Sequence, residues 1–221
     1  MKNYSKVIVA LDVENYLKAK YFIDRLYPRV RLFKVGLQLF TSCGQKIIRY
    51  IEKKGAGVFL DLKFFDIPNT VAQAVRQGTR LKVKMMTLHT SGAAEMLAAA
   101  VTAAQGESHS LNIKRPILLG VTVLTSQKSS KARVLAMAQA GLSCGLDGIV
   151  CSAREAAFLR KKIRRKFIIV TPGIRAKAVA ADDQKRTASA AQAFSWGADF
   201  IVVGRPILKA ADPLKALEGL L

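Results

Sequence analysis

An aspartate and a lysine, Asp61 and Lys63, stand two residues apart at the end of an apolar run, Val58–Phe64. Residues two apart on a β-strand point to the same face, so this carboxylate and this ammonium should lie side by side. Another lysine, Lys34, stands in the apolar run Arg31–Leu37. Charges on buried strands need partners, and a structural ion pair is the alternative for any one of these residues. A whole set of such charges at strand ends indicates a functional site.

Two later segments combine glycine with arginine, Pro172-Gly173-Ile174-Arg175 and Gly204-Arg205. Glycine lets a backbone N–H approach an oxyanion closely, and the arginine guanidinium offers a two-pronged donor. A turn glycine beside a solvated arginine is the alternative at either segment alone. Taken together, the two segments predict a phosphate site.

Short apolar, β-branched runs recur along the chain, with stretches of helical spacing between them. The eight runs are Lys6–Val13, Arg31–Leu37, Val58–Phe64, Met85–Thr90, Ile117–Leu124, Gly148–Ser152, Phe167–Gly173 and Phe200–Arg205. Several are apolar almost without alternation, as strands buried on both faces of a parallel sheet are.

Eight strands alternating with helices in 221 residues predict an α/β fold, a (β/α)8 TIM barrel that forms a single domain over residues 1–221. A doubly wound open sheet is the alternative, but it usually has a glycine-rich first turn, which Val9–Val13 lacks. In a TIM barrel the site lies at the carboxyl ends of the strands, and phosphate binds after strands seven and eight. The polar stretch Gln105–Asn112 is predicted to be a surface loop.

The net charge of +21 is the unusual bulk property of the chain. A basic surface attracts polyanions, so a nucleic-acid-binding module is an alternative function. Aromatic residues are not interleaved with the basic patches, which favours solvated helix faces that attract a small anionic substrate instead. Three cysteines without a C-x-x-C pair predict reduced thiols in the cytoplasm, and two histidines argue against a zinc cluster. No signal peptide or membrane span is expected.

The segment Asp61–Thr70 matches the D-x-K-x-x-D-I-P-x-T signature and so resembles the orotidine monophosphate decarboxylase family. Six further motifs follow the order of that family over nearly the whole chain, which makes the resemblance specific. They are Ala10-Leu11-Asp12, Phe33-Lys34-Val35-Gly36, Val121–Ser126, Thr171–Arg175, Asp182-Asp183-Gln184 and Val203-Gly204-Arg205.

The resemblance implies conversion of orotidine 5′-phosphate to UMP and CO2 in pyrimidine biosynthesis, without a cofactor or a metal. Loss of CO2 from C6 leaves a carbanion that cannot delocalise conventionally, so the site must stabilise charge and deliver a proton. By the same resemblance Lys63 donates that proton, held as a cation by neighbouring carboxylates, and Asp61 lies near the departing carboxylate. Lys34 orients Asp61 and contacts the ribose, Asp12 holds the ribose hydroxyls, and Thr125 contacts the base.

For the phosphate, the resemblance implies that Arg205 and the adjacent Gly204 grip the anion. Gln184 would bridge phosphate and pyrimidine from a loop that closes over the substrate. Arg175 matches the pattern and is expected mainly to order this loop. The segment 176–181 departs from the family, because it is rich in alanine where a more polar lid is expected.

The resemblance also implies a homodimer in which Asp66, the fourth member of the catalytic cluster, and Thr70 complete the neighbouring subunit's site. The closest rival function is a sugar-phosphate decarboxylase or aldolase-like synthase of the same barrel group, which would use magnesium. The residues after Asp66 and the Asp-Asp-Gln segment disfavour this rival. His89, near the barrel mouth, is expected to be a hydrogen-bonded structural histidine.

Overall fold

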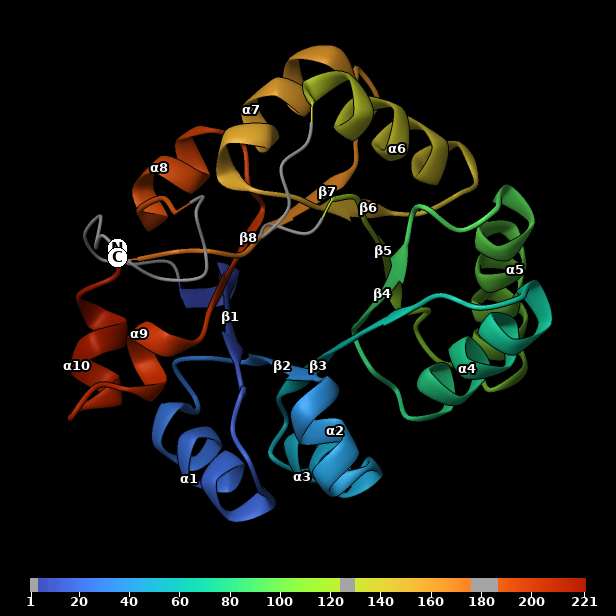
Figure 1. The fold of residues 1–221 in the computed structure, drawn as a ribbon. Coiled ribbons are helices and arrows are strands. Elements are labelled where there is room, and N and C mark those ends of the chain that lie inside the picture. Colours follow the sequence, from blue (N-terminus) through green and yellow to red (C-terminus); the bar gives the residue numbers. More distant parts are fainter. Residues whose placement is uncertain (1–3, 124–129, 176–186) are drawn as a thin grey trace.

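The computed structural model describes residues 4–123, 130–175 and 187–221. Eight parallel strands pair in chain order and close into a barrel, because β8 pairs with β1 (Figure 1). The strands are β1 (Val7–Ala10), β2 (Leu32–Gly36), β3 (Gly57–Phe64), β4 (Met85–His89), β5 (Ile117–Val121), β6 (Gly148–Val150), β7 (Ile168–Thr171) and β8 (Phe200–Val203). The predicted (β/α)8 barrel is confirmed.

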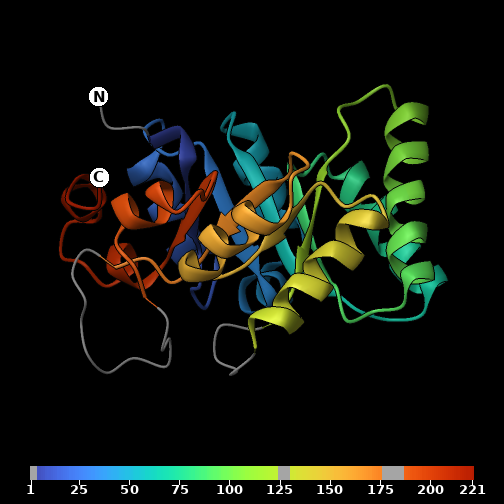
Figure 2. The same ribbon diagram turned by 90° about the horizontal axis from the view of Figure 1, so that it is seen from above.

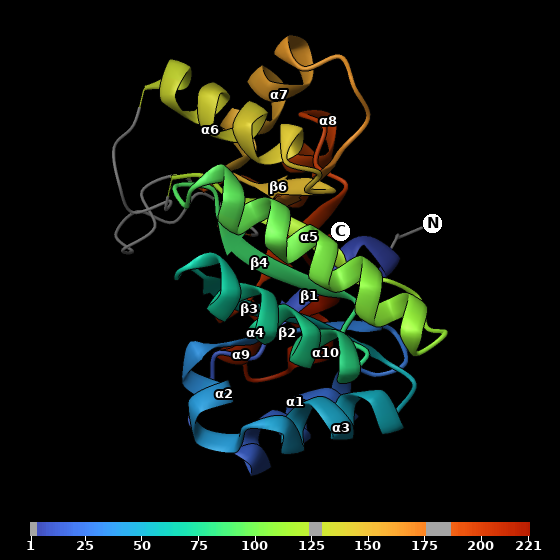
Figure 3. The same cartoon turned by 90° about the vertical axis from the view of Figure 1, so that its right-hand side faces the viewer.

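Helices surround this barrel on its outside (Figures 1 and 2). They are α1 (Tyr16–Leu26), α2 (Leu37–Cys43), α3 (Gln45–Lys53), α4 (Pro68–Arg80), α5 (Ala94–Ser110), α6 (Lys131–Ser143), α7 (Ala153–Lys162), α8 (Ala190–Ser195), α9 (Arg205–Leu208) and α10 (Pro213–Glu218), preceded by a 3₁₀ turn, Tyr4–Lys6. Helices α4 and α5 lie side by side over β3 and β4 (Figure 3). Among the helices that the structure describes, none is both long and apolar enough to cross a bilayer.

Both faces of the strands are buried, which explains why the strands are apolar without alternation. In β1, Val7 and Val9 pack outward against the helices, whereas Ile8 and Ala10 belong to the cluster that fills the barrel. The inner cluster consists of Ile8, Ala10, Leu32, Phe59, Met85, Leu119, Val170 and Val202. This inner packing closes the barrel and forms the floor beneath the carboxyl ends of the strands.

The structure corrects one predicted segment and shortens most strands. Helix α5 continues to Ser110, so the prediction of a surface loop over Gln105–Asn112 is wrong for its first six residues. The helix persists because Ser108 is buried and Glu107 pairs with Arg80 of α4 at 2.7 Å. Several predicted strands also extend beyond the observed ones. The residues after the last paired residue form loops or, at Leu37 and Arg205, begin a helix.

One irregularity of the sheet lies in β3, next to β4. Leu60 pairs with Met86 and Phe64 with Leu88, so β3 has two more residues than β4 over this stretch. Lys63, within the irregular stretch, has φ of 51°, a left-handed conformation that costs a non-glycine residue about 1–2 kcal/mol. The expected alternation that would place Asp61 and Lys63 on one face therefore breaks at Lys63.

Candidate active site

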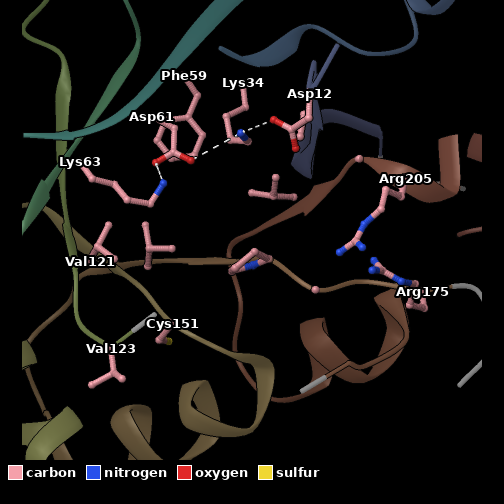
Figure 4. Close-up of a pocket in the computed structure, with 16 residues that line it drawn as sticks. Asp12, Lys34, Phe59, Asp61, Lys63, Val121, Val123, Cys151, Arg175 and Arg205 are labelled. Atoms are coloured by element: carbon pink, nitrogen blue, oxygen red, sulfur yellow. Dashed lines mark hydrogen bonds and ion pairs between the residues drawn. The ribbon is translucent and has the colours of Figure 1, made fainter. Parts of the chain in front are cut away.

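A cavity of about 220 Å³ opens at the carboxyl ends of the strands. Seven of the eight strands, or the residues that directly follow them, contribute to its wall. The lining residues are Ala10, Asp12, Lys34, Phe59, Asp61, Lys63, Val121, Val123, Val150, Cys151, Pro172, Gly173, Arg175, Val202, Gly204 and Arg205. In Figure 4 the lysines and aspartates lie along one side of this cavity, and the two arginines lie together at its far end.

Asp12, which follows β1, and the charged side chains of β2 and β3 form one connected cluster. Lys63 Nζ donates to Asp61 Oδ1 at 2.9 Å, and Lys34 Nζ lies 3.5 Å from Asp61 Oδ2. Lys34 Nζ also donates to Asp12 Oδ1 at 2.9 Å. Gly36 leaves the space that this ammonium occupies, because a Cβ there would come within 2.9 Å of Nζ. The predicted pairing of Asp61, Lys63 and Lys34 is therefore present despite the broken alternation of β3.

Asp61 lies at the centre of this cluster with 14% of its side chain exposed. Burial alone would raise the pKa of its carboxyl group, but the charges of Lys34 and Lys63 and the hydrogen bonds from Lys63 and Thr87 outweigh burial and hold that pKa below its usual range. Asp61 is therefore ionised at neutral pH. With Asp12 included, the cluster has two aspartates and two lysines, so the formal charge at this end of the cavity is close to zero.

Sequence reasoning missed Thr87, whose hydroxyl group joins two members of the cluster. Thr87 Oγ1 donates to Asp61 Oδ1 at 2.9 Å and accepts a hydrogen bond from the backbone N–H of Lys63 at 2.9 Å. The side chain is fully buried. The sequence offered one signal for this role, a hydroxyl residue within the otherwise apolar strand Met85–Leu88. Buried polar groups usually have hydrogen-bond partners, so a partner for Thr87 could have been expected.

The apolar wall of the cavity was also not predicted. It includes Phe59, which precedes Asp61 by two residues on the same face of β3, together with Val121 and Cys151 at the ends of β5 and β6. Burial raises the pKa of the Cys151 thiol well above its ordinary value, with Glu155 adding to the shift. An apolar wall facing the charged cluster lowers the local dielectric constant, which strengthens every electrostatic interaction in the cavity.

The far end of the cavity is built by the segments after β7 and β8, as predicted. Gly173 has φ of 82°, which favours glycine. Gly204 lies against β1, since an added Cβ would be 3.4 Å from the Cβ of Ala10 and 3.5 Å from Asp12 Oδ2. The guanidinium groups of Arg175 and Arg205 point toward each other here (Figure 4), and Arg175 Nη1 donates to the carbonyl oxygen of Ile174 at 2.9 Å. Two guanidinium groups at one end of a cavity form an anion-binding arrangement.

Not every predicted site residue lines this cavity. Asp66 and Thr70 are exposed outside it, and Asp66 Oδ1 accepts a hydrogen bond from the backbone N–H of Ile67 at 2.7 Å. Thr125, Gln184 and the alanine-rich segment 176–181 lie outside the described residues.

His89, at the end of β4, has Nδ1 at 2.5 Å from Ser91 Oγ, and its ring packs edge-on against Phe65. Burial and the nearby charge of Lys63 lower its pKa, so the ring is neutral at pH 7. The expected hydrogen bond of His89 is present. All three cysteines are free thiols, as predicted.

The fold and the cavity are those of a (β/α)8-barrel enzyme. A charged cluster and an anion-binding end share one cavity at the carboxyl ends of the strands. The profile of the family described as "Orotidine 5'-phosphate decarboxylase / HUMPS family" matches residues 5–220. The chain therefore belongs to this family.

Curated relatives and a solved structure agree with this assignment. The chain is 44% identical to a protein of Chromobacterium violaceum named orotidine 5'-phosphate decarboxylase, over 98% of this chain and 90% of the relative. It is 42% identical to the protein of that name from Vibrio cholerae, over 98% and 96% of the two chains. The crystal structure of orotidine 5'-phosphate decarboxylase from Lactobacillus acidophilus superposes with a TM-score of 0.85 at 33% identity, covering 98% of this chain and 97% of that one.

Proposed function

We propose that the protein converts orotidine 5′-phosphate to UMP and CO2, a step of pyrimidine nucleotide biosynthesis, and does so in the cytoplasm. The curated relatives that carry this activity in their names match almost the whole chain. The observation that carries the proposal is the layout of one cavity, with Lys63 and Asp61 at one end and two arginines at the other. This layout fits a ligand whose reacting carboxylate and phosphate are at opposite ends. The proposal assigns the whole chain, 1–221, to one catalytic domain.

In the proposed reaction the bond between C6 and the carboxylate breaks, and its electron pair stays on C6. Lys63 Nζ then transfers a proton to C6 and becomes neutral until it regains a proton from solvent. The ammonium is suited to this role because its ion pair with Asp61, at 2.9 Å, fixes its position in the cavity. Asp61 would lie beside the departing carboxylate, and Lys34 would keep Asp61 oriented from its other oxygen.

The other lining residues would bind the parts of the substrate that do not react. Asp12 and Lys34, which are hydrogen-bonded to each other, would hold the ribose hydroxyls. Gly204 and Arg205 would bind the phosphate, with Arg175 ordering the loop that follows it. The predicted contacts of Thr125 with the base and of Gln184 with phosphate and pyrimidine belong to the same proposal. Phosphate binding far from C6 would supply free energy that positions the reacting group.

The proposed active form is a homodimer in which Asp66 and Thr70 reach the partner's cavity. Both residues are exposed and outside the cavity of their own chain. Their neighbours Phe65 and Ile67 are 59% and 67% exposed, which is unusual for large apolar side chains that have no partner surface. An interface over this segment would bury the two apolar side chains and bring the acidic group of Asp66 to a second site.

An activity assay in the presence of chelator tests this proposal. The purified protein should consume orotidine 5′-phosphate, followed by ultraviolet absorbance, at the same rate with and without excess EDTA. Activity that disappears with EDTA would favour the rival magnesium-dependent sugar-phosphate enzyme. A Lys63→Ala protein purified in the same way is the matched control, because it reveals any activity that comes from the expression host.

A further inference from the structure

We propose that Thr87 is a positioning residue that fixes Lys63 and Asp61 relative to each other. Its hydroxyl group makes hydrogen bonds to both the backbone N–H of Lys63 and the side chain of Asp61. This inference rests on the proposed function, since its kinetic consequence concerns proton transfer by Lys63. Thr87 itself does not line the cavity.

The irregular pairing of β3 with β4 creates the need for such a contact. Over the stretch from Leu60 to Phe64, β3 has two extra residues, and Thr87 is the β4 residue that faces them. A regular parallel ladder would offer a backbone carbonyl oxygen to the N–H of Lys63. Here that N–H donates to the Thr87 hydroxyl at 2.9 Å instead. The hydroxyl group therefore replaces a missing ladder partner.

The left-handed conformation of Lys63 depends on this replacement. With φ of 51°, Lys63 adopts a backbone geometry that non-glycine residues avoid, and such geometry persists where surrounding contacts hold it. The geometry is what turns the Lys63 side chain to the same carboxylate oxygen that Thr87 contacts, because both groups bond Asp61 Oδ1 at 2.9 Å. Losing the hydroxyl group would leave a partly buried N–H without this partner at a strained residue.

The hydroxyl group also has a defined direction. Its single hydrogen is donated to Asp61, since a carboxylate can only accept, and its lone pair accepts from the Lys63 N–H. Thr87 is fully buried, and its β-branched side chain has restricted rotation about χ1. The contact is therefore rigid, and it orients Asp61 Oδ1 toward Lys63 while Oδ2 remains available to Lys34 at 3.5 Å.

Two substitutions separate the hydroxyl group from the shape of the side chain. Thr87→Val keeps the shape and removes both hydrogen bonds, whereas Thr87→Ser keeps the hydroxyl group. Thr79→Val is the matched control, because Thr79 is equally buried and donates one hydrogen bond to the Val75 carbonyl oxygen in α4, away from the cavity. Melting temperatures of all variants report how much each change costs the fold.

For Thr87→Val we expect kcat on orotidine 5′-phosphate to fall by about tenfold to a hundredfold, because small misplacements of a reacting group have effects of this size. KM should change by less than about threefold, since the arginine end of the cavity is untouched. Thr87→Ser should recover most of kcat, and Thr79→Val should keep it. A normal kcat for Thr87→Val would overturn the inference, and so would an equal loss for Thr87→Ser or a rise in KM alone.

A crystal structure of the Thr87→Val protein provides a test that does not need activity. We expect Lys63 to leave its left-handed conformation or Asp61 Oδ1 to turn away from Lys63 Nζ. Unchanged positions of both residues would overturn the positioning role, whatever the kinetics show. An unaltered protein that fails to decarboxylate orotidine 5′-phosphate would instead refute the proposed function, so the two failures are distinguishable.

Discussion

Replacing Asp61 by asparagine tests whether the charged cluster stabilises the fold as well as the reaction. The amide has the shape of the carboxylate, and its oxygen can still accept hydrogen bonds from Lys63 and Thr87. The negative charge between Lys63 and Lys34 is lost, however, and both ammonium groups are largely buried, with exposed side-chain fractions of 32% and 11%. We expect the Asp61→Asn protein to be less stable at neutral pH.

The distances set the size of this effect. At an effective dielectric constant of about 20, unit charges at 2.9 Å and 3.5 Å attract by about 6 and about 5 kcal/mol. Desolvation of the ions offsets most of this attraction, and removal of one partner from a buried pair typically costs about 3–5 kcal/mol. For a chain of 221 residues each kcal/mol lowers the melting temperature by about 2–4 °C. The expected decrease is therefore about 6–20 °C.

The pH dependence provides an internal check on the cause. The pKa of Asp61 is lower in the folded protein than in the unfolded chain, so its ionised form adds stability above the unfolded value of about 4, and this stability is lost as pH falls through the folded value. The difference in melting temperature between the two proteins should be constant from about pH 7 to about pH 5. It should shrink below about pH 4.

Thermal unfolding followed by circular dichroism measures both quantities, and decarboxylation assays show the loss of activity. Asp24→Asn is the matched control, because Asp24 also pairs with two lysines, at 2.6 Å and 2.5 Å, but lies on α1 outside the cavity. It should lose stability and keep kcat, whereas Asp61→Asn should lose about a hundredfold or more of kcat. An Asp61→Asn protein as stable as the wild type at pH 7 would refute the electrostatic reasoning.

Three further predictions follow from the same site. Arg205→Ala should lower kcat/KM for orotidine 5′-phosphate by about a hundredfold to a thousandfold, the size of effect seen when one partner of a charge pair is removed. The slow reaction of orotidine, which lacks the phosphate, should hardly change, and equal losses for the two substrates would count against phosphate binding by Arg205. Lys63→Ala and Asp66→Ala dimers should each be inactive, and exchanging their subunits should recover about a quarter of wild-type activity. Half of the randomly assorted dimers then contain one of each subunit and have one intact site of two. No recovery after verified subunit exchange would contradict a shared site. Burial raises the pKa of the Cys151 thiol, so a disulfide reagent at pH 8 should react with two of the three thiols in the folded protein and with the third only after unfolding. Rapid reaction of all three thiols in the folded protein would disprove the burial of Cys151.

The barrel was predictable from sequence because its strands are buried on both faces, so that runs such as Val7–Ala10 are apolar throughout. Strand ends were less predictable, since apolar residues such as Leu37 and Cys151 continue beyond the last ladder pair. The polar end of α5 was predicted as a loop because polarity marks exposure there, whereas the contact between Glu107 and Arg80 depends on two helices packing side by side. The local sequence pattern around Gln105–Asn112 does not reveal a contact with another helix.

In the site, residue types and motif order identified Asp61, Lys63, Lys34, Gly204 and Arg205, which all line the cavity. The role of Thr87 and the conformation of Lys63 were not predictable in this way. Both follow from a two-residue mismatch between neighbouring strands that are 24 residues apart at their contact. A mismatch of this kind exists only once the strands are paired.

The amino-acid sequence by itself determined the closed parallel barrel and the chemical groups at the carboxyl ends of its strands. Residue types and their spacing indicate which strands are buried on both faces and where charged side chains follow them. The tertiary structure alone decided how these groups meet. A left-handed lysine in β3 and two arginines from the segments after β7 and β8 line one cavity, and a buried hydroxyl group from β4 holds that lysine from behind the cavity wall. Closing the barrel brings these segments, far apart in sequence, together at the carboxyl ends of the strands.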